Sequence, residues 1–210
     1  MKIEVPTTLN DITLAQYQRF MEANKEGADE DFLLFKTIEV FCGVDIKLVS
    51  QFPMDDAQDI AAEVNAVLNQ AAPFQRHFSL NGVEYGFIPD MEAMTIGEYI
   101  DLESGMGDPK QFHKAAAVMY RPVKKRFKDL YTIEPYSGSN EALAIAKEFP
   151  MGAISAGFVF FYNIANELLA DSPAYLKEIL EKISTIPEQH SSIKNGAGLT
   201  VSTTSAEDSL

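Results

Sequence analysis

The dipeptide Asn81-Gly82 is the feature of this sequence that most constrains its fold. It lies between two runs in which apolar residues alternate with others, and both of its residues tolerate the positive φ that a two-residue hairpin turn requires. Residues 74–87 (FQRHFSLNGVEYGF) therefore predict one antiparallel β-hairpin. We also predict a short strand over Lys2–Val5, ended by Pro6.

Helix caps and helical apolar stripes account for most of the remaining chain. Thr13 with Gln16, and Thr95 with Glu98, each match a capping box, in which the two residues satisfy each other's free backbone N–H groups. The expected helices begin at these two caps and also cover residues 32–42, 55–70, 109–120, 140–149, 151–169 and 173–184. The predicted fold is therefore α+β, predominantly helical, with one small antiparallel β-hairpin element.

The sequence gives weaker signals between residues 109 and 134. Arg121-Pro122 predicts the end of the helix over residues 109–120, because a proline disfavours helical backbone in the residue before it. Residues 130–134 fit either a strand or a loop.

Two stretches of the sequence are alike. Residues 1–50 and 84–125 each contain a strand end, a proline, a Thr-x-x-Gln/Glu cap followed by tyrosine, an acidic loop and a second helix. Two interpretations stay open. One is a duplicated supersecondary unit, and the other is that a good helix cap recurs independently in a helical protein.

We expect residues 1–184 to form a single compact, mostly helical domain. The chain is 46% apolar, which is enough to build a substantial core. From residue 185 the sequence becomes rich in Ser, Thr and Gly and contains few large apolar residues. This composition predicts a flexible C-terminal tail over residues 185–210, either inert or ordered by a partner.

The charge balance is strongly acidic, with 31 Asp and Glu residues against 17 Lys and Arg and a formal net charge of −14. A nucleic-acid coat or a protein that binds anionic membranes needs a broad basic face, so we expect neither kind of partner. The single cysteine, Cys42, excludes an intramolecular disulfide and is expected to be a core thiol. The longest apolar stretch, residues 151–166, is shorter than a membrane span, and we predict a fully buried helix there.

We predict no enzymatic activity, no cofactor and no metal site. His77, His113 and His190 have no metal-ligand partner at helical or turn spacing. The acidic clusters lie at predicted helix starts, where the helix dipole accounts for them. An enzyme of unknown class stays an alternative if Glu98, Asp101 or His113 belong to a deep pocket with converging polar groups.

A basic cluster stands out against the acidic background. It places five of the 17 basic residues within eight positions, together with one phenylalanine: Arg121, Lys124, Lys125, Arg126, Phe127 and Lys128. These residues are the candidate partner-docking site, suited to an acidic partner, with a nucleic acid and the acidic face of another copy of the chain as the two alternatives. The alternative interpretation is a solvated helix end, where cations complement the helix dipole.

Three segments carry a resemblance to known proteins: ITLAQYQRF (residues 12–20), EYGFIPDMEAMTIGEYID (84–101) and FHKAAAVMYRP (112–122). They are similar to small proteins from the structural-gene region of tailed bacteriophages, in particular crAss-like phages and marine podoviruses. The acidic, helical chain with its Thr-Leu-x-x-Tyr helix start also resembles tail assembly chaperones. The motifs are structural, so the resemblance implies no catalytic residues.

The resemblance implies a non-enzymatic role in virion morphogenesis. A tail assembly chaperone binds helical phage proteins, above all the tape-measure protein. The implied partners are therefore other phage structural or tail proteins, with self-association as a further expectation. The implied location is the host cytoplasm during assembly, or the virion. One alternative is a structural virion component, such as a neck, ring or cargo protein, and another is an acidic module that binds a host protein.

Overall fold

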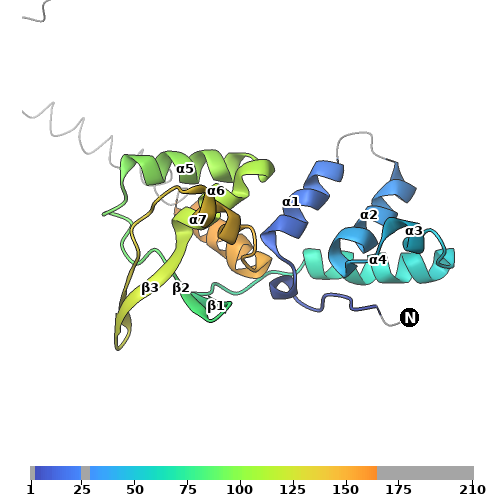
Figure 1. Cartoon of the computed structure of the whole chain (residues 1–210), viewed down its shortest axis with the longest axis horizontal. Coiled ribbons are helices and arrows are strands. Elements are labelled where there is room, and N and C mark those ends of the chain that lie inside the picture. Colours follow the sequence, from blue (N-terminus) through green and yellow to red (C-terminus); the bar gives the residue numbers. More distant parts are fainter. Residues whose placement is uncertain (1–2, 25–28, 165–210) are drawn as a thin grey trace, which may run out of the picture. The chain divides into compact units, whose positions relative to one another are not determined.

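A computed structural model of the chain describes residues 3–24 and 29–164. Helices pack against a four-stranded antiparallel sheet, which confirms the predicted α+β class (Figure 1). The elements in chain order are η1 (Leu9–Asp11), α1 (Leu14–Ala23), α2 (Glu30–Cys42), α3 (Ile46–Val49), α4 (Met54–Leu68), β1 (His77–Leu80), β2 (Val83–Phe87), α5 (Ile96–Gly107), η2 (Pro109–Gln111), α6 (Phe112–Met119), β3 (Tyr120–Phe127), β4 (Leu130–Ile133), α7 (Asn140–Ala146) and a helix described over residues 151–164.

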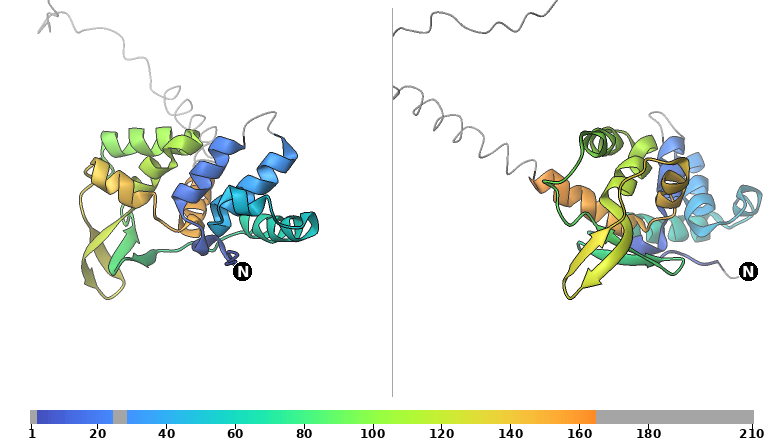
Figure 2. Two further views of the ribbon diagram at one scale, coloured as in Figure 1. Left: turned by 45° about the vertical axis from the view of Figure 1, so that its right-hand side comes forward. Right: turned by 60° about the vertical axis from the view of Figure 1, so that its left-hand side comes forward.

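The sheet has the strand order β1-β2-β3-β4, and every neighbouring pair is antiparallel. Asn81 (φ 52°) and Gly82 (φ 78°) form the turn between β1 and β2, which confirms the predicted hairpin. The sheet is larger than predicted, because β3 and β4 add a second hairpin beside the first (Figure 2). Of the two alternatives for residues 130–134, the strand is the one observed.

The predicted helix end before Arg121-Pro122 is confirmed, because α6 ends at Met119, but the strand β3 that follows directly was not predicted. Pro122 is the last residue of β3 that pairs with β2, opposite Tyr85. From Val123 onward β3 pairs with β4 instead, and the register shifts between Val123 and Lys125. A proline has no N–H to donate, and sheets tolerate it where a ladder ends or a bulge begins.

The predicted N-terminal strand is also wrong. Residues 3–7 have no regular secondary structure, and the chain passes from them into η1. There the carboxylate of Asp11 accepts hydrogen bonds from the backbone N–H groups of Thr7 and Thr8, at 3.0 and 2.8 Å. This local network fixes the turn before α1 without strand pairing.

Both predicted capping boxes are present. The Thr13 hydroxyl accepts from the Gln16 N–H at 3.2 Å, and the Gln16 side chain accepts from the Thr13 N–H at 2.8 Å. Thr95 and Glu98 make the same two bonds, at 3.3 and 2.7 Å. In addition, the Gln16 amide donates to the carbonyl of Val40 in α2 at 3.0 Å. The two helical hairpins are therefore alike, but only the second follows a strand, so the duplication stays a prediction.

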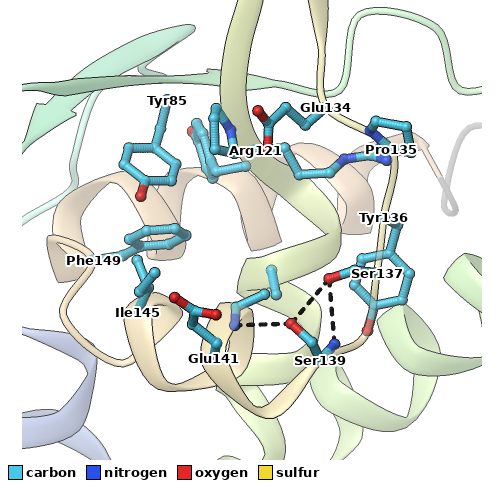
Figure 3. A pocket seen from close by; sticks show the side chains of 14 residues that line it. Tyr85, Arg121, Glu134, Pro135, Tyr136, Ser137, Ser139, Glu141, Ile145 and Phe149 are labelled. Carbon is cyan, nitrogen blue, oxygen red and sulfur yellow. Dashed lines mark hydrogen bonds between the residues drawn. The ribbon is translucent and has the colours of Figure 1, made fainter.

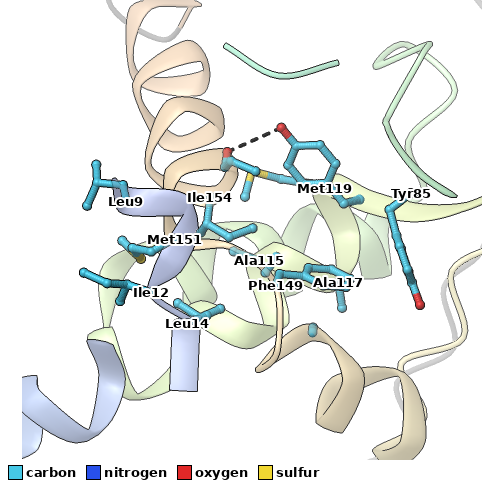
Figure 4. Close-up of a cluster of buried hydrophobic side chains, with 14 of the residues drawn as sticks. Leu9, Ile12, Leu14, Tyr85, Ala115, Ala117, Met119, Phe149, Met151 and Ile154 are labelled. Carbon is cyan, nitrogen blue, oxygen red and sulfur yellow. Dashed lines mark hydrogen bonds between the residues drawn. The ribbon is translucent and has the colours of Figure 1, made fainter. Parts of the chain in front are cut away.

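The main hydrophobic core joins β2 and β3 to α1, α6 and the helix of residues 151–164 (Figure 4). Tyr120 and Phe149 are almost fully buried near its centre. The Tyr120 hydroxyl donates to the carbonyl of Gln75 at 2.6 Å, so the polar end of this buried ring is satisfied. The ring of Phe149 lies 4.8 Å from that of Tyr85 and 5.1 Å from that of Phe78. These contacts fix the sheet against the helices.

A second, smaller apolar cluster lies among α2, α3 and α4, and is formed by Ile38, Val44, Val49 and Ala57. Both α2 and α4 were predicted, whereas the four-residue helix α3 was not. The side chain of Asp45 caps α3 by accepting from the Lys47 N–H at 2.8 Å. A helix this short presents no apolar period, and only its cap marks it in the sequence.

The helix of residues 151–164 is buried in its first half only. Met151 and Ile154 lie in the core, whereas Val159 and Tyr162 are exposed, so the prediction of a fully buried helix is wrong beyond the second turn. In the part of the chain that the structure describes, each helix is too short or too polar to span a lipid bilayer. The described residues, 3–24 and 29–164, belong to one compact unit. The predicted helix over 173–184 and the predicted tail over 185–210 lie outside the described residues.

Candidate docking site

The predicted docking residues lie on β3 and on the turn that joins it to β4. Arg121, at the start of β3, faces the interior, whereas Lys124 and Lys125 are exposed further along the strand. Arg126 forms an ion pair with Glu84 on β2, with a distance of 2.7 Å between Nη1 and Oε1. The structure therefore does not bring the six residues into one patch, since Arg121 is separated from the five near the end of the hairpin.

Arg121 instead forms a buried ion pair with Glu98 of α5. Its Nη1 lies 2.7 Å from Glu98 Oε1, and the two side chains are 11% and 7% exposed. The other carboxylate oxygen, Oε2, accepts from the N–H and the hydroxyl of Thr95 in the capping box, at 2.7 and 2.8 Å. One carboxylate thus caps α5 and fastens it to the sheet.

Opposing effects set the protonation of this pair. Burial acts to raise the pKa of Glu98, but the hydrogen bonds from Thr95 and the cation of Arg121 outweigh it and hold that pKa below its ordinary value of 4.5. Burial lowers the pKa of Arg121, and Glu98 opposes this effect. Among the described residues, none accepts a hydrogen bond from the buried Nε of Arg121. The arginine therefore depends on Glu98 for compensation of its charge.

A cavity of about 320 Å³ lies between β3, α7 and the chain that connects β4 to α7 (Figure 3). The rings of Tyr85, Phe149 and Tyr136 form much of its wall, and the carboxylates of Glu134 and Glu141 also line it. This volume is at the lower end of the roughly 300–1,000 Å³ found for small-molecule sites. The guanidinium of Arg121 also lines the cavity, so its lining carries both signs of charge.

The serine and Tyr136 hydroxyl groups around the cavity have structural partners. Ser139 caps α7 by accepting from the Ala142 N–H at 3.2 Å, and the Ser137 hydroxyl donates to the Ser139 hydroxyl at 3.1 Å (Figure 3). The Tyr136 hydroxyl donates to Asp101 at 2.8 Å, and burial, followed by this bond, raises the pKa of Tyr136. None of Glu98, Asp101 and His113 lines this cavity. The serines serve a helix cap and are not arranged as nucleophiles beside a base.

The other singled-out side chains are placed separately. Burial lowers the pKa of both His77 and His113. Cys42 is partly buried at the border of the two apolar clusters, and burial raises the pKa of its thiol. Over residues 3–24 and 29–164, no three His, Cys, Asp or Glu side chains gather as they would around a metal ion. His190 lies outside the described residues.

The solvent side of α5 carries three large apolar residues. The buried positions are Glu98, Leu102 and Gly105, which follow one another at i, i+4 and i+7. The opposite side carries Ile96, Tyr99 and Ile100, which are 81%, 56% and 56% exposed. An ordinary surface helix buries its apolar stripe and exposes its polar one, so three large apolar residues on the solvent side depart from that pattern. We call the three exposed residues the α5 face.

The packing of α5 on α6 explains why its apolar residues point outward. A Cβ atom added to Gly105 would lie 2.5 Å from the backbone nitrogen of Ala115, so only glycine permits this close approach. The glycine on one turn and the Glu98–Arg121 pair on another fix the rotation of α5 about its axis. Sequence reasoning missed the α5 face, because hydrophobicity alone assigns Ile96 and Ile100 to the core.

A second exposed apolar group lies at the tip of the β3–β4 hairpin. Phe127 and Leu130 are paired across the two strands, and each is 72% exposed. Figure 1 shows this hairpin extending away from α5, α6 and α7. The structure thus presents two separate surfaces with the composition of protein contacts.

Comparison with protein-family models, with curated proteins and with solved structures gave no significant match. The resemblance to tail assembly chaperones therefore stays a prediction.

Proposed function

We propose that this protein is a non-enzymatic assembly factor of a tailed bacteriophage, of the tail assembly chaperone type. In this proposal it binds a helical phage protein, the tape-measure protein, through the α5 face. The observation that carries the proposal is the exposure of Ile96, Tyr99 and Ile100 on a helix whose orientation is fixed by buried contacts.

The spacing of the α5 face suits a helical partner. Residues at i, i+3 and i+4 form one continuous surface on a helix, and an amphipathic helix can lay its own apolar stripe along it. Fully burying one large apolar side chain contributes roughly 1.5–3 kcal/mol, so three such residues supply enough free energy for a specific but reversible contact. Reversibility is what a chaperone requires.

The charges beside the α5 face indicate what the partner helix carries. Glu103, one turn beyond Ile100, is exposed, as are Asp90 and Glu92 just before the helix. The whole chain also has a net charge of −14. We therefore expect the bound helix to flank its apolar stripe with Lys or Arg. An acidic chaperone that covers such a helix keeps the complex dispersed through its own net charge.

The proposal is tested by co-expressing the chain with the tape-measure protein encoded by the same phage and measuring how much of that protein stays in solution bound to the chain. The variant Ile96→Gln/Ile100→Gln removes the apolar surface and is expected to lower the bound amount at least about tenfold, equivalent to 1.4 kcal/mol or more. The matched control is Val83→Gln/Val159→Gln, which changes two exposed apolar residues on β2 and on the helix of residues 151–164. Equal loss in the variant and the control would contradict the proposal.

Mass spectrometry of purified particles separates the chaperone from its nearest alternative. A chaperone is expected to be absent from mature virions. A neck, ring or cargo protein is present in a fixed copy number. Recovery of this chain at fixed stoichiometry would replace the chaperone assignment with a structural one.

A further inference from the structure

We propose that the tip of the β3–β4 hairpin binds the acidic face of α4 on a second copy of this chain. This contact uses a surface other than the α5 face and does not rest on the function proposed above. We call residues 124–130 the hairpin tip.

The hairpin tip combines positive charge with exposed apolar area. Phe127 and Leu130 lie opposite each other at its end. Lys124, Lys125 and Lys128 are all exposed, and the ion pairs that the structure describes on this hairpin use its two arginines and none of these lysines. An apolar centre with a charged rim is the usual composition of a protein contact, and its charge selects an acidic partner.

The backbone of the tip departs from ordinary geometry at Lys128. Its φ of 55° lies in the left-handed region that glycine, asparagine and aspartate adopt most readily. The Lys128 ammonium lies 5.6 Å from the centre of the Phe127 ring, so the charge and the aromatic surface adjoin. A lysine at this position costs stability that asparagine would not.

The chain itself carries the complementary surface. Asp55, Asp59 and Glu63 follow one another at i, i+4 and i+8 along the exposed side of α4. The structure gives no ion pair to any of these three carboxylates within residues 3–24 and 29–164. Met54, 49% exposed, lies at the end of this row and offers an apolar contact for the aromatic tip. We call these three acids the α4 row.

A second copy is the occupant that the charges favour. The hairpin concentrates basic residues in a chain with 31 acidic residues and 17 basic ones, so a second copy offers acidic surface that complements it. The contact joins two different surfaces. It therefore either occurs twice in a symmetric dimer or continues from copy to copy into a ring or an open filament.

Analytical ultracentrifugation of the full chain at low and high salt tests the inference. The wild type is expected to self-associate at low salt and to dissociate as salt is raised, because exposed charges are screened. The tip variant Lys124→Glu/Lys125→Glu/Lys128→Glu and the row variant Asp55→Lys/Asp59→Lys/Glu63→Lys are each expected to weaken association at least about tenfold. The control Lys47→Glu/Lys110→Glu/Lys147→Glu makes the same charge change at exposed lysines elsewhere on the chain. It is expected to retain more of the self-association than the tip variant does.

Mixing the two charge-reversed variants gives the decisive result. The tip of one then opposes the row of the other with both charges exchanged, so association is expected to return in the mixture although each variant alone is impaired. A wild type that stays monomeric at low salt, or a mixture that does not recover, would overturn the inference. Saturable binding of a single-stranded RNA probe that the tip variant loses would assign the tip to nucleic acid instead. Variants of the α5 face are expected to leave self-association unchanged, which separates this inference from the proposed function.

Discussion

Among single residues, Glu98 connects the most parts of the structure, because one carboxylate caps α5 and neutralises Arg121 of β3. The variant Glu98→Gln separates these two roles, since a glutamine completes the cap of α1 in the same way. We expect Glu98→Gln to lower the free energy of unfolding by about 3–5 kcal/mol, because it leaves a buried cation without a partner. Urea unfolding measures this loss. Adding Arg121→Met to Glu98→Gln is expected to recover part of the lost free energy of unfolding. If Glu98→Gln alone unfolds with a free energy within about 0.5 kcal/mol of the wild type, the ion pair is not needed for stability.

The same pair predicts how stability depends on pH. The pKa of Glu98 is below its ordinary value of 4.5 in the folded chain, so its stabilising effect is complete above pH 4.5 and is lost as pH falls through the folded-state pKa. The difference in unfolding free energy between the wild type and Glu98→Gln is therefore expected to be constant near neutral pH and to shrink on acidification below 4.5. A difference that grows on acidification would have the wrong sign for this mechanism.

Part of this residue-level organisation follows from the sequence. Thr95 and Glu98 are predictable as a cap, because a capping box needs only residues three apart. The pairing of Glu98 with Arg121 is not, because β3 must first bring a distant residue beside α5. Arg121 therefore looked like one more member of a basic cluster, and only its burial separates it from Lys124 and Lys125.

Among the elements, the β3–β4 hairpin shows where sequence patterns fail. The first hairpin is predictable from Asn81-Gly82, whereas the turn of the second uses Lys128-Asp129 and has no glycine. Its strand β3 is buried or half-buried over its first four residues and exposed over its last four, so it lacks the alternation of apolar and polar residues that predicts a strand. Pro122 added a misleading signal, since its place at the end of a ladder depends on the neighbouring strands.

The left-handed backbone at Lys128 makes a direct prediction for this hairpin. Lys128→Asn is expected to raise the free energy of unfolding by roughly 0.5–1 kcal/mol, because asparagine adopts positive φ more easily. Lys128→Val is expected to lower it by more than about 1 kcal/mol, because a β-branched residue is strained there. Thermal unfolding compares the two. The same stability in both variants would mean that the turn adjusts its backbone freely.

On the scale of the whole molecule, the candidate site depends on packing that hydrophobicity does not predict. In α5 the buried positions include a charged residue, Glu98, and a glycine, Gly105, while two isoleucines point to solvent. The folded structure explains why Glu98 and Gly105 are buried. Arg121 compensates the charge of Glu98, and Ala115 approaches Gly105 too closely for any other residue. The sequence therefore predicts the class of fold and most of its helices, but not which surface stays free for a partner.

The most direct test of the α5 face is site-specific photo-cross-linking of the full chain co-expressed with the tape-measure protein. A benzophenone amino acid is placed at position 99, where it replaces an exposed tyrosine, and at position 32 as a control, where it replaces a phenylalanine that is 41% exposed on α2. The account predicts a cross-link to the tape-measure protein from position 99 and little from position 32. Equal cross-linking from both positions, or none from position 99, would contradict it.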